Sequence, residues 1–360
     1  MLKWPTHGSN PQFLYEALQL DMPESVIDFS ANINPLGPPS IVKDRWNELY
    51  SLVSDYPDPT AERLTGLLAK KEGVRKEQIL VGNGGAELIS LVGRLLSGKK
   101  ALIVQPAFSE YEEACRVNQC EVRYHLMDVD SWDLRLNELL VNLREVDAVF
   151  LCNPNNPTGM FYSKPTIDFL ASECAKYGTI LIIDEAFYDF VEGYESTVSC
   201  LQHGGNMIIL RSMTKMFSIP GIRLGYLIAN EALLAKIRES KPHWSVNAIA
   251  MKVGEWCVSE SDYVEQTIQL VKQEWESLQS FYREQEFSYS PSTVNFYLLK
   301  DKKVSDQFPL FRFLMEKGMI PRHTMNFPGL NGKWLRLAIK GPTEHERLLE
   351  VMSEWRKVES

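Results

Sequence analysis

Residues 207–223, MIILRSMTKMFSIPGIR, decide the fold class of this chain. The segment opens with four apolar residues, which suit a strand buried on both faces, and continues directly into Arg211, Ser212, Thr214 and Lys215. In open α/β sheets, ligands bind just outside the carboxyl ends of the strands. A buried strand that runs into hydroxyls and cations therefore predicts a ligand site at the edge of such a sheet.

Further short runs rich in β-branched residues precede and follow this segment, each bounded by Gly, Pro or Asn. They cover residues 78–81, 101–104, 148–152, 179–183 and 224–229. Between several of them lie helical patterns, such as residues 86–96 and 164–176, with apolar residues three and four positions apart. Strands that are apolar on both faces and alternate with helices are typical of a mostly parallel sheet covered on both sides. We therefore expect an α/β fold.

The chain length and a change of pattern predict three parts. With 360 residues, the chain exceeds the ~250–300 at which a single core stops growing. Residues 41–250 would form the large domain and residues 251–360 a smaller α/β domain. The elements expected in the smaller domain are a long helical stretch and two isolated strands, at residues 251–284, 295–299 and 334–338. Residues 1–40 contain six prolines, too many for continuous regular structure, and we expect them to form an arm or lid that packs with the small domain.

The composition is that of an ordinary globular enzyme, with 44% hydrophobic and 24% charged residues. Acidic residues outnumber basic ones 47 to 38, and neither sign gathers into a block that would indicate a nucleic-acid or membrane partner. The first ten residues hold no apolar run, and no stretch approaches the ~18 apolar residues of a membrane span. These features favour a cytoplasmic location.

The cysteines and histidines give little sign of a metal site. The six cysteines include no CxxC pair, and most have apolar neighbours, which is typical of buried free thiols. The six histidines form no HxxxH pair and do not cluster with cysteines. We expect no protein-bound metal.

Three other strand ends carry polar groups. The run GNGGAE at residues 82–87 leads into a helix and would aim free backbone N–H groups at an anion. The run NPNNPTG at residues 153–159 contains two prolines that could hold an Asn side chain rigidly over a pocket. Asp184 follows the apolar run at 179–183. Taken singly, these segments could be a loop, a turn and a helix cap, and residues 211–223 could be solvated surface.

The four strand ends share one edge of one sheet, so we interpret them as one site. Together they supply an amine that can form an imine, a carboxylate for a protonated ring nitrogen, an Asn donor for a phenolic oxygen, and a cradle for a phosphate. This set of groups fits pyridoxal 5′-phosphate.

In this order, the motifs resemble the fold-type-I pyridoxal-phosphate enzymes of the class I and II aminotransferase superfamily, over essentially the whole chain. The resemblance implies a mostly parallel seven-stranded sheet in the large domain, a small α/β domain, and a homodimer with shared active sites. It implies that Lys215 carries the cofactor covalently, that Asp184 pairs with the ring nitrogen and that Asn156 hydrogen-bonds the phenolic oxygen. The residues implied at the cofactor phosphate are Gly85, Ala86, Ser212, Thr214 and Arg223.

The same resemblance assigns three further side chains. Phe108, in Pro-Ala-Phe at residues 106–108, matches the aromatic residue that stacks on the cofactor ring. Tyr56 matches a tyrosine that reaches the phosphate from the other subunit. Arg336 matches the arginine that grips the α-carboxylate of the substrate.

Within the superfamily, the chain is most similar to the threonine-phosphate decarboxylases of cobalamin biosynthesis. The matching motifs are HGSN, DFSANINPLG, WSVNA and NFPGL, at residues 7–10, 28–37, 244–248 and 326–330. Ser9 stands where a second glycine is usual. Phe187 stands where many aminotransferases of the superfamily have a tyrosine that donates to the ring oxygen; Tyr188 next to it leaves a shift in register open, and Phe187 could also be plain core.

This branch implies decarboxylation of L-threonine O-3-phosphate to (R)-1-amino-2-propanol O-2-phosphate and CO₂. Its substrate needs a second anion pocket, which the resemblance assigns to His7, Asn32 and Arg322, with Asn156 and Arg336 also contacting the substrate. The alternative is an aminotransferase that acts on histidinol phosphate with 2-oxoglutarate. Two other readings have less support: a ligand-sensing regulator would need a DNA-binding segment, and a nucleotide-dependent oxidoreductase would need GxGxxG spacing at residues 82–85.

Overall fold

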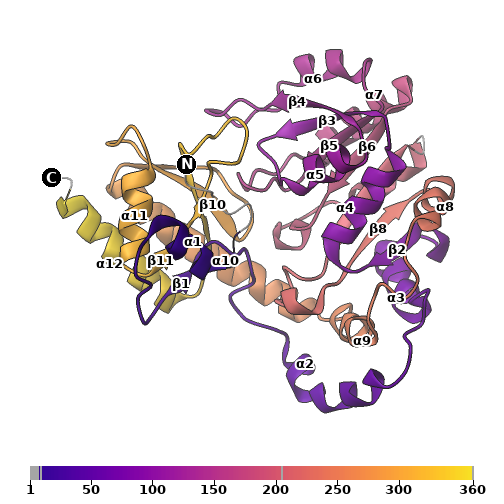
Figure 1. Ribbon diagram of the computed structural model, residues 1–360, viewed down its shortest axis with the longest axis horizontal. Coiled ribbons are helices and arrows are strands. Elements are labelled where there is room, and N and C mark those ends of the chain that lie inside the picture. The colour runs from indigo at the N-terminus through magenta and orange to yellow at the C-terminus, as the bar shows by residue number, and fades with distance from the viewer. Residues whose placement is uncertain (1–7, 9, 204–205, 359–360) are drawn as a thin grey trace.

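A seven-stranded sheet forms the centre of the larger part of the molecule (Figure 1). The computed structural model describes residue 8 and residues 10–203 and 206–358. The strand order is β2-β8-β7-β6-β5-β3-β4, and only β8 runs antiparallel to its neighbours. The strands are β2 (Ile79–Gly82), β3 (Lys100–Gln105), β4 (Glu121–Leu126), β5 (Ala148–Cys152), β6 (Ile180–Asp184), β7 (Met207–Ser212) and β8 (Gly225–Ala229). The expected α/β class with a mostly parallel seven-stranded sheet is confirmed.

The structure corrects the strand list in two ways. β4 was not predicted, because it lies at the edge of the sheet and its residues are mostly exposed or half-buried, so it lacks a continuous apolar run. Three strands also extend further than their apolar runs. Gly82, Asp184 and Ser212 are the last residues of β2, β6 and β7, where hydrogen bonds to neighbouring strands continue into the polar segment.

Helices cover both faces of this sheet, as the buried strands predict. Ile182 and Ile208 point into a core shared with α4, α5 and α8, whereas Ile183 and Ile209 point into a core shared with α3, α6, α7 and α9. The helices are α3 (Glu62–Glu72), α4 (Gly84–Leu95), α5 (Glu110–Val117), α6 (Leu136–Leu143), α7 (Lys164–Tyr177), α8 (Glu231–Glu239) and α9 (Ala248–Cys257). Successive residues of one strand therefore serve different cores.

A second, four-stranded antiparallel sheet forms the smaller part, in the order β12-β13-β10-β9. Its strands are β9 (Phe287–Tyr289), β10 (Phe296–Asp301), β12 (Arg322–His323) and β13 (Leu335–Ala338), and the helices around it are α10 (Ser261–Glu284), α11 (Phe308–Glu316) and α12 (Pro342–Val358). The single helical stretch expected at 251–284 is wrong, because the chain leaves the helix after Cys257 and begins α10 at Ser261.

Residues of the predicted arm lie beside the smaller part (Figure 1). They include α1 (Pro11–Leu18), which tolerates Pro11 because proline fits the first turn of a helix. β1 (Ile27–Asp28) pairs in parallel with β11 (Met319–Ile320) in a separate two-stranded sheet and so ties the arm to the smaller part. The domain boundaries at residues 40 and 250 stay predictions. Within the described part of the chain, every helix is too short or too polar to cross a bilayer.

Candidate active site

A cavity of about 330 Å³ opens where the strand ends of the large sheet face the second sheet. Twelve residues expected at the site line this cavity: Asn32, Gly85, Ala86, Phe108, Asn156, Asp184, Ser212, Thr214, Lys215, Arg223, Arg322 and Arg336. Tyr56 does not line the cavity of its own chain and is 84% exposed. His7 lies outside the described residues.

One end of the cavity is built to hold an anion. The N–H groups at the start of α4 have no partners within the helix, and Gly85 and Ala86 of this turn line the cavity. Gly84 has φ +76°, and a Cβ there would lie 2.6 Å from a guanidinium nitrogen of Arg223. Glycine therefore permits Arg223 to lie against the helix end. The hydroxyls of Ser212 and Thr214 lie 2.9 Å apart in the same wall.

Lys215 presents an amine whose basicity is reduced. Removal from water lowers the pKa of Lys215 to about 8, and the positive charges of Arg336 and Arg223 act in the same direction, against Asp184. At pH 7 a pKa of about 8 leaves roughly a tenth of the amine neutral, on the order of 300 times more than an unperturbed lysine has. Only the neutral amine can attack an aldehyde, so the cavity activates this group.

Asp184, at the end of β6, is buried and well oriented. Its Oδ2 accepts a hydrogen bond of 2.6 Å from the Tyr111 hydroxyl and its Oδ1 one of 2.9 Å from the Ala186 N–H. Burial raises the pKa of Asp184, while these two donors favour the charged form. A cation in the cavity would therefore find a fixed carboxylate.

The asparagine side chains of the loop after β5 have two different roles. Asn153 exchanges hydrogen bonds with the backbone of Tyr162, and Asn155 bonds the backbone of Pro106 and accepts from Thr158, so both hold the loop. Asn156 lines the cavity, and its Oδ1 accepts a hydrogen bond of 2.6 Å from Arg336. The rigid loop thus presents one amide to the site.

Two arginines reach the cavity from the second sheet. Arg336 and Arg322 are register partners on β13 and β12. Arg336 donates to Asn156 and to the Ser30 carbonyl at 2.6 Å each, and both acceptors are neutral. Removal from water lowers the pKa of Arg336 to about 9 and that of Arg322 to about 10. Two guanidinium groups so placed favour a ligand with two anionic groups.

Arg322 is held by its own neighbours. It donates at 2.8 Å to the amide oxygen of Asn326 and at 3.0 Å to the carbonyl of His323. Its guanidinium lies 5.3 Å from the ring centre of Phe327. Asn32, on the facing arm segment, is buried, and its amide oxygen has no hydrogen-bond partner among residues 8, 10–203 and 206–358. The Arg322 guanidinium, which is predicted to bind the substrate phosphate, is therefore oriented by its neighbours before a substrate binds.

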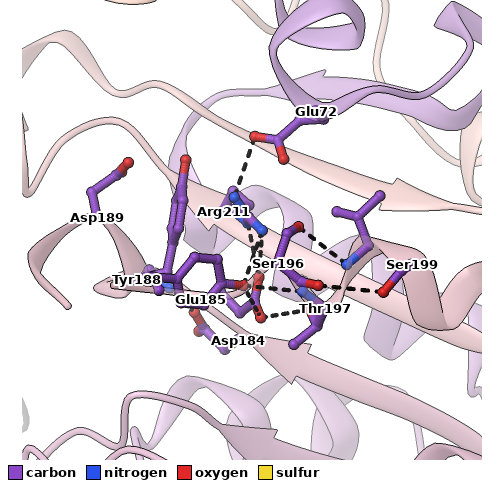
Figure 2. Close-up of polar contacts among 12 residues, drawn as sticks. Glu72, Asp184, Glu185, Tyr188, Asp189, Ser196, Thr197, Ser199 and Arg211 are labelled. Atoms are coloured by element: carbon purple, nitrogen blue, oxygen red, sulfur yellow. Dashed lines mark hydrogen bonds and ion pairs between the residues drawn. The ribbon is translucent and has the colours of Figure 1, made fainter. Parts of the chain in front are cut away.

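The residues next to Asp184 and Ser212 in the chain, Glu185 and Arg211, form a buried ion pair with each other. Figure 2 shows the Arg211 side chain between Glu185 and Glu72. Arg211 donates to Glu185 at 2.8 Å and to Glu72 at 3.2 Å, and its guanidinium lies 3.5 Å from the ring centre of Tyr188. The sequence predicted that two hydroxyls and two cations of residues 211–223 converge on the site, and Ser212, Thr214, Lys215 and Arg223 all line the cavity. Arg211 also lines the cavity, while its guanidinium is held by the two carboxylates.

The side chains of the neighbouring residues Phe187 and Tyr188 also lie in different surroundings. Phe187 lines the cavity and packs edge-on against Phe296, with ring centres 4.8 Å apart. Tyr188 instead lies on Arg211 and approaches the Tyr226 hydroxyl. Phe187 is therefore both a core residue and a cavity wall, and Tyr188 is not among the cavity's lining residues.

Sequence reasoning missed several lining residues, among them Tyr111, Cys152, Ser30 and Asn326. Tyr111 lies in the first turn of α5, whereas Phe108 precedes the helix, so no helical spacing links the two residues in the sequence. Ser30 contributes its backbone carbonyl, and no residue type signals that role.

The donors and acceptors of the cavity fit pyridoxal phosphate group by group. The helix end with Arg223 and two hydroxyls suits the phosphate, Lys215 the aldehyde, Asp184 the ring nitrogen, and Asn156 the phenolic oxygen. The buried hydroxyl of Ser109, also in the wall, lacks a partner within the described chain. Nowhere among these residues do three or more His, Cys, Asp or Glu side chains gather as metal ligands.

Comparisons with known proteins agree with this geometry. The threonine-phosphate decarboxylase of Salmonella typhimurium is 34% identical over 349 residues, which are 96% of this chain and 95% of that protein. The adenosylcobalamin biosynthesis bifunctional protein CobDQ of Leptospira interrogans is 32% identical over 97% of this chain and 41% of its own length. The histidinol-phosphate aminotransferase structure from Clostridium acetobutylicum superimposes with a TM-score of 0.85, at 28% identity, over 92% of this chain and 98% of that one.

The sequence pattern of aminotransferase class I and II matches residues 24–352, which include both sheets and, apart from Gly8, the residues that line the cavity. The chain therefore belongs to the class I and II aminotransferase family.

Proposed function

We propose that this protein is a pyridoxal-phosphate-dependent threonine-phosphate decarboxylase, which converts L-threonine O-3-phosphate to (R)-1-amino-2-propanol O-2-phosphate and CO₂. The observation that carries the proposal is the pair of buried guanidinium groups, Arg336 and Arg322, in one cavity with the activated amine of Lys215. A small amino acid with a carboxylate and a phosphate matches both. The 34% identity to the Salmonella decarboxylase supports this substrate, and the name of the Leptospira relative supports a place in cobalamin biosynthesis.

The bound cofactor supplies an electron sink for the pair left at Cα when a bond there breaks. The chain's own residues decide which bond that is. Arg336 binds the α-carboxylate and Arg322, with Asn32 and His7, the substrate phosphate. Anchoring both ends fixes rotation about the Cα–N bond and thus aligns the carboxylate bond for cleavage. After CO₂ leaves, Cα needs a proton, and Lys215, with a pKa of about 8, can deliver it.

The direct test adds L-threonine O-3-phosphate to the cofactor-loaded protein and follows CO₂ release. A parallel assay uses histidinol phosphate with 2-oxoglutarate and follows glutamate. We expect CO₂ without glutamate, since Phe187 offers no hydroxyl to the cavity and the chain is 34% identical to the Salmonella decarboxylase. Glutamate formation alone would move the protein to the aminotransferase branch while leaving the cofactor site unchanged.

Replacing Arg336 by alanine tests the carboxylate pocket. We expect the KM for threonine phosphate to rise about 30-fold or more, because a buried charged partner is lost, while the absorbance of the bound cofactor is unchanged. Inhibition by 1-amino-2-propanol O-2-phosphate, which lacks the carboxylate, should stay the same in this variant. The Arg322→Ala variant should lose that inhibition. Loss of the cofactor from Arg336→Ala would contradict the assignment.

The proposal includes a homodimer in which Tyr56 reaches the cofactor phosphate of the partner chain. Support comes from an apolar surface around η1 (Trp46–Val53), which extends away from both sheets near α2 (Ser40–Asp44) in Figure 1. Its exposed side chains are Trp46, Tyr50, Val53, Tyr56 and Trp244. Exposed aromatic residues gathered in this way are typical of an interface. The expected cytoplasmic location stays a prediction.

A further inference from the structure

Tyr111 connects two side chains that the proposed cofactor would contact on different sides. It lies in the first turn of α5 and is 1% exposed. Its hydroxyl donates to Asp184 at 2.6 Å. Its ring lies edge-on to Phe108, with centres 6.0 Å apart, and stacks on Phe150 at 5.5 Å. One buried side chain thus positions both the carboxylate expected at the ring nitrogen and the aromatic ring expected over the cofactor.

Among the residues the structure describes, the Tyr111 hydroxyl and the Ala186 N–H are the two hydrogen-bond donors to the Asp184 carboxylate. Burial disfavours the charged form of Asp184 and raises its pKa, and the Tyr111 hydrogen bond acts against this effect. Burial and the neighbouring carboxylate also raise the pKa of Tyr111 well above its ordinary value. The hydroxyl therefore remains a donor throughout the neutral range.

We propose that Tyr111 is a positioning residue of the decarboxylase, whose hydroxyl orients the Asp184 carboxylate toward the ring nitrogen of the cofactor. The inference rests on the proposed function. A carboxylate that keeps a proton on the ring nitrogen makes the cofactor a better electron acceptor. Tyr111 contributes through Asp184, and the side chains proposed to bind the substrate, Arg336 and Arg322, lie on the second sheet. Its loss should affect turnover more than substrate binding.

The test is Tyr111→Phe, which keeps the ring contacts with Phe108 and Phe150 and removes only the hydroxyl. We expect kcat to fall about 10- to 100-fold, the range for a hydrogen bond to a charged group, with KM changed less than about twofold. Loss of the donor raises the pKa of Asp184, so its carboxylate becomes protonated at a higher pH than in the wild type. The acid limb of the kcat profile should therefore move to higher pH.

Tyr15→Phe is the matched control. Tyr15 is 2% exposed, and its hydroxyl donates at 2.7 Å to the Met315 carbonyl, outside the residues that line the cavity. Tyr15→Phe should lose about as much stability as Tyr111→Phe, because each variant loses one buried hydroxyl. It should keep the wild-type kcat and pH profile. If Tyr111→Phe behaves like Tyr15→Phe, with an unmoved acid limb, the proposal is overturned.

A second measurement does not depend on turnover. The pH titration of the cofactor's absorbance and the cofactor affinity are compared for Tyr111→Phe in the wild-type and Asp184→Asn backgrounds. If Tyr111 acts through Asp184, the Tyr111→Phe substitution shifts the absorbance titration and the cofactor affinity in the wild-type background. In the Asp184→Asn background it has little further effect on either quantity. Equal effects in both backgrounds would show a merely structural role. A wild-type protein that binds cofactor but releases no CO₂ would refute the substrate assignment and leave these readouts valid.

Discussion

We expect the Lys215→Ala variant to have no measurable decarboxylase activity, a loss on the order of 10⁴-fold or more, and to lack the absorbance band of covalently held cofactor. The reason is the position of the amine. Lys215 lies between the anion cradle of Arg223 and the carboxylate of Asp184, where its pKa falls to about 8. No other lysine lines the cavity among the residues the structure describes. Absorbance spectra and CO₂ release measure the two effects independently.

Lys272→Ala serves as the control for this variant, because Lys272 is an exposed partner of Glu192 and its loss changes the net charge equally. It should match the wild type in both assays. A Lys215→Ala protein with a normal band and turnover would contradict the cofactor site as a whole.

The Lys215→Ala variant can also test the proposed dimer, when its chains are mixed with chains of a second variant. In a mixed dimer of Lys215→Ala and Tyr56→Ala chains, shared sites would place an intact Lys215 and an intact Tyr56 at one of the two sites. We expect cofactor affinity and activity above those of either parent after co-refolding. No gain over the Tyr56→Ala parent would mean that Tyr56 does not serve the partner's site.

Replacing Arg211 by leucine has the largest expected effect on stability, a loss of roughly 3–5 kcal/mol in the free energy of unfolding. The Arg211 side chain is 1% exposed, and its carboxylate partners Glu185 and Glu72 are 0% and 5% exposed. Without the guanidinium, two buried carboxylates face each other with no cation between them (Figure 2). Tyr194 and Thr197 donate to Glu185 but carry no charge to offset its own. Urea unfolding of the wild type and the variant measures the difference.

The control for Arg211→Leu is Arg312→Leu, which removes an exposed ion pair with Glu316 on α11. Such a pair contributes about 0–1 kcal/mol. A loss for Arg211→Leu no larger than for Arg312→Leu would show that the buried network adds little to stability. Because Glu185 and Arg211 adjoin Asp184 and Ser212 in the chain, we also expect weaker cofactor binding in the Arg211 variant.

The sequence by itself determined the fold class and the edge of the sheet at which the site lies. Apolar runs long enough for buried strands, each ending in polar residues, are local features. Because parallel strands have their carboxyl ends at the same edge of a sheet, the polar residues that follow them are expected to lie close together. For this reason the sequence alone predicts that Lys215, Asp184, Asn156 and the glycine turn at residues 82–85 share one cavity.

Only the tertiary structure decided the partners of neighbouring polar residues. Arg211 and Ser212, or Asp184 and Glu185, are equally polar in the sequence. In the structure Arg211 and Glu185 bond to each other in a buried ion network, whereas Asp184 accepts from the Tyr111 hydroxyl and Ser212 bonds the Thr214 hydroxyl. The contact of Tyr111 with Asp184 joins residues 73 positions apart. Such contacts depend on how helices and sheets pack across the whole chain, and no local pattern of residues specifies them.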